Sequence, residues 1–102
     1  MLSLWLDDEG LEFDEAASGE EALERSGERP YDLVLLDQRM PPGMNGIEVA
    51  EAMRSSGQTM PIVLYSGYLD PAVLARAEEM GLRTVDRGEP DRLMEAVRAE
   101  LQ

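Results

Sequence analysis

The side chains best suited to chemistry in this chain are a carboxylate and a hydroxyl that each follow a short apolar run. Asp37 comes directly after residues 33–36, and Ser66 directly follows residues 62–65. Continuous apolar runs of this length are typical of strands buried on both faces of a parallel sheet. Because the crevice of such a sheet lies at the carboxyl ends of its strands, we predict that Asp37 and Ser66 lie close together there. Position alone leaves a second interpretation open, in which Asp37 only caps the loop that follows it.

Several residue types that carry chemistry in other proteins are absent. The chain has no histidine, no cysteine and no lysine, so all nine basic residues are arginine. The sequence therefore excludes a histidine base, an imidazole metal ligand, a phosphohistidine, a disulfide and a thiolate metal site. No glycine-rich phosphate loop follows a strand, which weakens the hypothesis of a nucleotide-binding domain or an enzyme, and we expect no enzyme.

The charge balance is strongly acidic, with 22 acidic residues and a net charge of −13. Direct binding to nucleic acid needs a cationic face, which this composition does not provide. The acidity favours either simple solubility or a site for Mg²⁺ or a basic partner. No apolar run is long enough to cross a membrane and no secretory signal begins the chain, so we expect a cytoplasmic protein without membrane association.

Strand-like and helix-like segments alternate along the chain. The expected strands lie at residues 11–14, 33–36, 62–65 and, more weakly, 82–85, and amphipathic helix patterns follow each of them. Repeated alternation of this kind predicts right-handed crossovers and a parallel sheet covered by helices. The length of 102 residues suits one domain, residues 1–102.

Local signals mark the ends of the expected helices. Ser18 and Glu21 form a capping box for the first helix. Asp70 followed by Pro71 gives the third helix an N-cap and a proline at its first position, and Gly81 ends that helix.

The segment that begins at Asp37 resembles the signature of response-regulator receiver domains. In that family a strand ends in aspartate, Met-Pro follows three residues later, and a short loop closes with glycine before the next helix. Here Met40 and Pro41 stand at those positions, with one extra proline in the loop. Ser66 resembles the family's Thr/Ser position after the next strand. The resemblance covers residues 2–101 and implies a flavodoxin-like (CheY-like) α/β fold with a doubly wound parallel sheet.

The resemblance also implies a role in two-component signalling. Asp37 would be the phosphoacceptor of a phosphorelay, with a histidine kinase or a phosphotransfer protein as partner, and Ser66 would be the switch hydroxyl. In the family Mg²⁺ is held by the acceptor aspartate, an acidic pair and a backbone carbonyl, which would here be that of Arg39. The metal neutralises the phosphoryl charge in the transition state.

The chain departs from the family at the cation of the last loop. The family has Lys-Pro there, and residues 85–90 offer only Arg87, which differs from lysine in geometry. Residues 82–86 also lack the family's aromatic side chain. A degenerate pseudo-receiver, an interaction module that keeps the fold without phosphorylation, is therefore the alternative function.

The first strand of the family is the second departure. Residues 4–9 look like that strand and its acidic pair, but only Glu9 and Gly10 lie between the acidic pair and the next strand. A parallel crossover needs about a dozen residues. We therefore interpret Leu2, Trp5 and Leu6 as the end of the first helix in a truncated or degenerate receiver. On this interpretation the sheet lacks the usual first strand, and the acidic pair and most of the first helix are absent too. An antiparallel hairpin turning at residues 7–10 is the competing interpretation.

A missing first strand has two consequences. Asp37 alone cannot supply the oxygens that an octahedral ion requires, so we expect weak Mg²⁺ binding. Unpaired backbone groups in neighbouring strands would also cost about 1–3 kcal/mol each. Those strands must pair directly, recruit residues 1–6 as a strand, or take a strand from another copy in a homodimer.

Overall fold

The computed structural model describes residues 2–7, 10–15, 18–28, 31–38, 43–67 and 69–101. Its strands are β1 (Leu2–Asp7), β2 (Gly10–Glu15), β3 (Leu33–Leu36), β4 (Ile62–Ser66) and β5 (Arg83–Asp86). Its helices are α1 (Gly19–Glu28), α2 (Gly46–Ser55), α3 (Pro71–Met80) and α4 (Pro90–Leu101). The strands form one sheet in the order β2-β1-β3-β4-β5. This is the flavodoxin-like order that the family resemblance implies.

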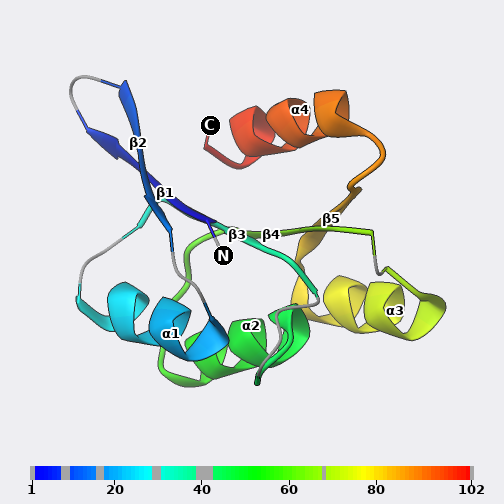
Figure 1. Ribbon diagram of the computed structural model, residues 1–102, viewed down its shortest axis with the longest axis horizontal. Coiled ribbons are helices and arrows are strands. Elements are labelled where there is room, and N and C mark those ends of the chain that lie inside the picture. The colour runs from blue at the N-terminus through cyan, green and yellow to red at the C-terminus, as the bar shows by residue number, and fades with distance from the viewer. Residues whose placement is uncertain are drawn as a thin grey trace.

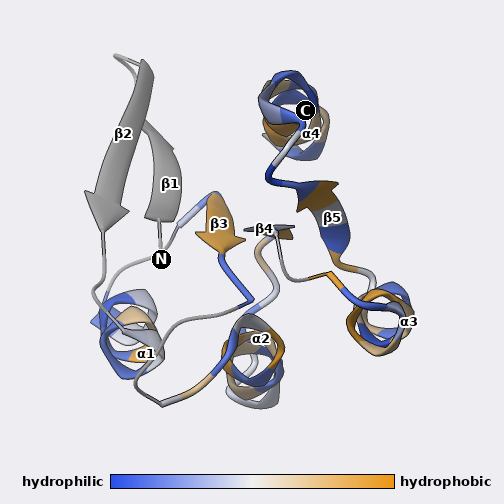
Figure 2. Cartoon of the chain, turned by 45° about the vertical axis from the view of Figure 1, so that its right-hand side comes forward, coloured by the Kyte–Doolittle hydropathy of each residue, from blue (hydrophilic) through white to orange (hydrophobic). Residues whose placement is uncertain are grey.

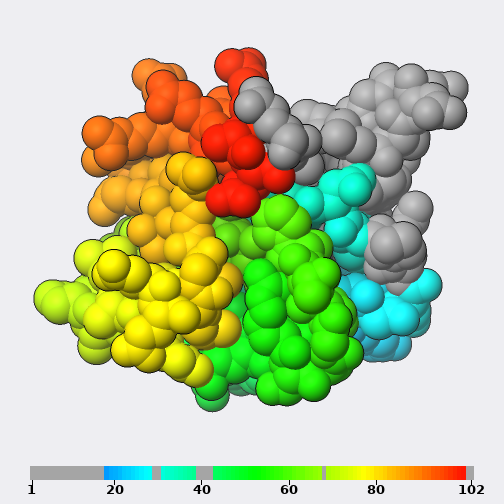
Figure 3. All heavy atoms as spheres, turned by 180° about the vertical axis from the view of Figure 1, so that it is seen from behind, coloured from blue at the N-terminus to red at the C-terminus, as the bar shows by residue number. Residues whose placement is uncertain are grey.

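Helices cover the sheet on two sides. Helices α1, α2 and α3 lie in a row against one face, and α4 lies alone against the other (Figure 1). The view in Figure 2 shows the same three layers and draws β3 in orange, the hydrophobic end of the scale. From behind, α2 and α3 lie side by side with α4 above them (Figure 3).

The continuous apolar run of β3 serves both layers of the core. Val34 and Leu36 belong to the cluster on the side of α1, α2 and α3, while Leu33 and Leu35 belong to the cluster under α4. Successive residues of a strand point to opposite faces, so a strand between two helical layers must be apolar at every position. All four side chains are buried, which confirms the sequence interpretation.

Polar caps set the helix ends. The backbone N–H of Glu21 donates to Ser18 Oγ at 3.1 Å at the start of α1. Asp70 Oδ1 accepts from Val73 N at 2.9 Å at the start of α3, and that helix ends at Gly81 with a left-handed φ of 72°. These ends agree with the sequence signals.

The N-terminal segment differs from the helix that we expected. Leu2–Asp7 is a strand, and it pairs with β2 in an antiparallel hairpin in which Asp7 lies opposite Gly10. The connection between these strands is too short for a parallel pair, but an antiparallel pair needs no crossover. The interpretation of Leu2, Trp5 and Leu6 as a helix end is therefore wrong, and the competing interpretation, an antiparallel hairpin, is confirmed. The hairpin takes the place of the parallel first strand of the family.

Strand β1 fills the central position of the sheet in the reverse direction. Leu2 pairs with Leu35 and Leu4 pairs with Leu33, so β1 runs antiparallel to β3 as well as to β2. Strands β3, β4 and β5 are parallel to one another. The backbone groups that a gap would leave unpaired are thus satisfied within the chain, by the second of the three predicted routes.

Candidate functional site

Asp37 is the first residue beyond β3, and the start of α2 packs directly against it. Gly46 N donates to the carbonyl of Gln38 at 3.0 Å, and Ile47 N donates to Gln38 Oε1 at 2.9 Å. A Cβ at Gly46 would lie 2.6 Å from the carbonyl oxygen of Asp37 and 2.8 Å from Leu64 Cδ2. A side chain at position 46 would therefore displace Asp37, which explains the glycine at this position of the motif.

Ser66 lies beside Asp37 at the carboxyl end of the neighbouring strand. Its Oγ donates to Asp37 Oδ1 at 2.7 Å, and the residue is fully buried. The parallel register pairs Leu36 with Leu64, which brings the ends of β3 and β4 to one edge. The predicted proximity of Asp37 and Ser66 is confirmed.

Arg87, which directly follows β5, contacts the same carboxylate. Its Nη2 lies 2.6 Å from Asp37 Oδ2 in an ion pair. The backbone holds the residue there, because Ser66 pairs with Asp86 and Arg87 N donates to the carbonyl of Ser66 at 3.1 Å. The arginine side chain is 55% exposed and that of Asp37 is 26% exposed, so the pair lies at the partly exposed carboxyl edge of the sheet. Each carboxylate oxygen of Asp37 thus contacts a donor.

Tyr65 is a part of this site that the sequence analysis missed. Its ring lies under the Arg87 guanidinium, with the Cζ atom 5.3 Å from the ring centroid. Its hydroxyl donates to the carbonyl of Arg87 at 3.4 Å, and Arg87 Nη2 donates back to the carbonyl of Tyr65 at 3.5 Å. A cation held over an aromatic face in this way is attracted by the ring quadrupole. The signal in the sequence that could have indicated this role is that a polar aromatic residue ends the otherwise aliphatic run of residues 62–65.

The donor set around Asp37 does not fit an octahedral metal ion. Among the described residues there is no group of three or more acidic, histidine or cysteine side chains that could hold a metal. Because β1 is reversed, Asp7 ends that strand at the edge opposite Asp37. The backbone carbonyl of Arg39, predicted as a further ligand, lies outside the described residues. Mg²⁺ prefers six oxygen ligands. Of the described carboxylates at this edge, Asp37 pairs with Arg87, and Asp86 Oδ1 accepts from Gly88 N at 2.8 Å.

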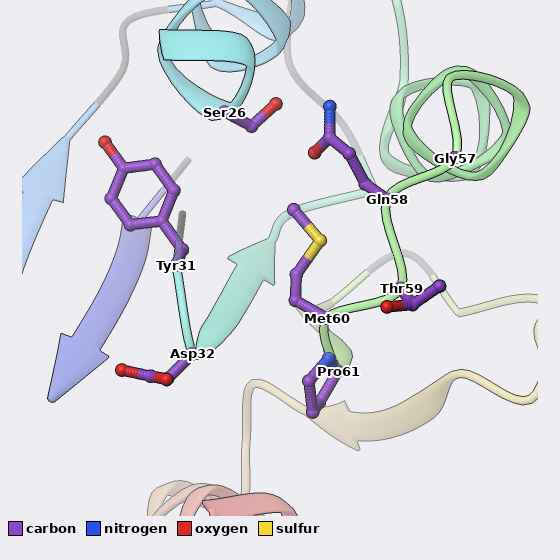
Figure 4. A pocket seen from close by; sticks show the side chains of 8 residues that line it. All are labelled: Ser26, Tyr31, Asp32, Gly57, Gln58, Thr59, Met60 and Pro61. Carbon is purple, nitrogen blue, oxygen red and sulfur yellow. The ribbon is translucent and has the colours of Figure 1, made fainter. Parts of the chain in front are cut away.

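A hollow lies at the other edge of the sheet, away from Asp37 (Figure 4). This cavity of about 490 Å³ is lined by residues that precede β3 and β4, among them Tyr31, Asp32, Gln58 and Met60. Gln58 Oε1 is buried there without a hydrogen-bond partner in the described part of the chain. The cavity is therefore separate from Asp37, Ser66 and Arg87, which lie at the carboxyl ends of the strands.

Comparison with known proteins identifies the family. Residues 1–98 match the family model of the response regulator receiver domain. The chain belongs to this family. As a receiver domain it is part of two-component signal transduction, and phosphoacceptor function is typical of the family. Receiver domains are generally signalling modules. They typically bind Mg²⁺ at the phosphorylation site.

Two curated relatives come from Bacillus subtilis. The receiver domain is 37% identical to the transcriptional regulatory protein ResD over 79% of this chain and 33% of that protein. It is 33% identical to the sporulation initiation phosphotransferase F over 74% of this chain and 60% of that protein. The chain therefore spans less than two thirds of the length of these relatives.

Solved receiver structures share the fold. A two-component response regulator of the LuxR family from Aurantimonas is 28% identical with a TM-score of 0.76, over 84% of this chain and 62% of that one. The Vibrio cholerae chemotaxis protein CheY4 is 25% identical with a TM-score of 0.75, over 86% of this chain and 76% of that one. In the described part of this chain, no helix has the length and apolarity needed to cross a membrane.

Proposed function

We propose that this receiver domain, residues 1–102, accepts a phosphoryl group on Asp37 in a phosphorelay. The observation that carries the proposal is the carboxylate of Asp37 between two donors, Ser66 Oγ at 2.7 Å and Arg87 Nη2 at 2.6 Å. A nucleophile, a hydroxyl and a cation at one strand edge are the parts that phosphoryl transfer requires. The donor would be a histidine kinase or a phosphotransfer protein, and the location would be the cytoplasm.

The transfer would replace one covalent bond to phosphorus with another. A carboxylate oxygen of Asp37 attacks the phosphorus atom and forms an O–P bond. The P–N bond of a phosphohistidine, or the anhydride P–O bond of acetyl phosphate, breaks at the same time, and its electron pair leaves with the departing group. Little covalent chemistry falls to the protein, so positioning and charge neutralisation by Arg87 are its contribution.

Ser66 is the proposed switch hydroxyl. Its Oγ donates to Asp37 Oδ1 in the structure described here, and this hydrogen bond would pass to a phosphoryl oxygen after transfer. Ser66 ends β4 and the chain then leads to α3, which begins at Pro71. A shift of Ser66 toward the phosphoryl group would therefore pull on the segment before α3, in the way that modification commonly orders a loop.

Incubation with acetyl phosphate tests the proposal. Intact mass spectrometry is expected to show one added phosphoryl group on the wild-type protein and none on Asp37→Asn. Asp91→Asn is the matched control, because Asp91 is an exposed acid in the first turn of α4, and we expect it to accept phosphate like the wild type. Phosphorylation of Asp37→Asn to the wild-type extent would contradict the assignment.

A pseudo-receiver that acts as an interaction module without phosphorylation is the second candidate. The observation that favours it is the ion pair at Asp37, which already neutralises the carboxylate, together with the poor fit of the described residues to Mg²⁺. On this alternative the wild-type protein gains no phosphoryl group from acetyl phosphate, while its fold and its affinity for a partner are unaffected by Asp37→Asn.

A further inference from the structure

The positive charge at Asp37 comes from the protein itself. Arg87 Nη2 lies 2.6 Å from Asp37 Oδ2, and the same nitrogen donates to the carbonyl of Tyr65 at 3.5 Å. The guanidinium lies over the Tyr65 ring, with Arg87 Cζ 5.3 Å from the ring centroid. The arginine is therefore held at the carboxylate by an ion pair, a backbone acceptor and an aromatic face.

This charge stands where a divalent ion would have to bind. An ion coordinated by Asp37 Oδ2 would lie within a few ångströms of the guanidinium, because both would contact the same oxygen. Two cations at that separation repel each other strongly at a partly buried site. The reversed β1 ends with Asp7 at the opposite edge of the sheet and not beside Arg87.

We infer that Arg87 takes the place of the divalent cation, so that phosphoryl transfer to Asp37 is independent of Mg²⁺. This inference rests on the proposed function and adds a role for Arg87. A guanidinium presents planar donors that match two phosphoryl oxygens at once, which a lysine ammonium does not. With 55% of its side chain exposed, Arg87 has room to move from Oδ2 to the incoming phosphoryl group.

The step balances without a metal ion. Asp37 Oδ2 forms the new bond to phosphorus while the anhydride bond of acetyl phosphate breaks, and acetate leaves with the electron pair. Arg87 exchanges one anionic partner, the carboxylate, for another, the phosphoryl oxygens. An arginine that neutralises a phosphoryl transition state raises transfer rates by large factors in other proteins.

Phosphorylation by acetyl phosphate in excess EDTA and in excess Mg²⁺ tests the inference, with intact mass as the readout. The wild type is expected to react at rates that agree within about twofold in the two conditions, because Arg87 supplies the charge in both. Arg87→Ala is expected to react at least about tenfold more slowly in EDTA. Arg92→Ala is the control and is expected to match the wild type, since Arg92 is an exposed residue of α4 that pairs with Glu89. Phosphorylation of the wild type only with Mg²⁺ would overturn the inference and leave the phosphoacceptor proposal intact.

Calorimetric titration with MgCl₂ tests the same inference without phosphorylation. The wild type is expected to show no binding that depends on Asp37. Arg87→Ala removes the ion pair at Asp37 Oδ2, and we expect this variant to gain weak Mg²⁺ binding that is lost again when Asp37→Asn is added. Tight, Asp37-dependent binding to the wild type would contradict the inference. If no variant is phosphorylated in any condition, the proposed function fails, and the wild-type and Arg87→Ala titrations still decide whether Arg87 excludes the metal.

Discussion

At the scale of single residues, the site shows which signals a sequence carries. Asp37 and Ser66 were predictable because each ends a strand that is apolar at every position, and such strands must lie inside a parallel sheet. Tyr65 was not predictable in the same way, because it reads as the last member of an apolar run. Its role depends on Arg87, which is distant in sequence and reaches it only through the pairing of β4 with β5.

The close approach of α2 to Asp37 leads to a stability prediction for Gly46→Ala. The added Cβ would meet the backbone oxygen of Asp37 at 2.6 Å, so we expect a loss of about 1–3 kcal/mol in the free energy of unfolding. Gly27→Ala is the matched control, because nothing lies within 4 Å of its Cβ and alanine favours a helix. Urea denaturation compares the two, and equal effects would show that the contact at Gly46 is not tight.

At the scale of elements, the helix ends were predictable and the first strand was not. Ser18, Asp70 and Gly81 cap helices through contacts with residues only a few positions away. Such local pairs can be recognised from their spacing in the sequence. The direction of β1 depends instead on its pairing with β3, a strand about thirty residues later. The short connection between β1 and β2 rules out a parallel pair, and an antiparallel hairpin places β1 at the central position of the sheet.

Because β1 is hydrogen-bonded on both sides, a proline within it should disrupt the sheet. Ser3 pairs with Asp14 in β2 and with Val34 in β3. Ser3→Pro removes a backbone donor and restrains φ at a central position, and we expect a loss of about 3 kcal/mol or more. Ser3→Ala is the control, and its midpoint of urea unfolding should lie near that of the wild type. A Ser3→Pro protein as stable as Ser3→Ala would mean that β1 contributes little to the sheet.

At the scale of the whole molecule, the filled central position bears on the predicted homodimer. Strand exchange was proposed to supply a missing strand, and β1 of the same chain occupies that position. We therefore expect a folded monomer of 11.3 kDa in sedimentation equilibrium at micromolar concentration. A mass of twice this value would show that a surface other than a sheet gap joins two copies. The net charge of −13 also opposes self-association at low ionic strength.

The phosphoacceptor assignment is tested most directly by trapping the modified residue. Borohydride reduces an aspartyl phosphate to homoserine, and tandem mass spectrometry then locates the reduced residue in the sequence. After treatment with acetyl phosphate, we predict homoserine at position 37 alone, because Asp37 is the carboxylate that lies against both Ser66 Oγ and Arg87 Nη2. Homoserine at another acidic position, or at none, would contradict the assignment of Asp37 as the phosphoacceptor.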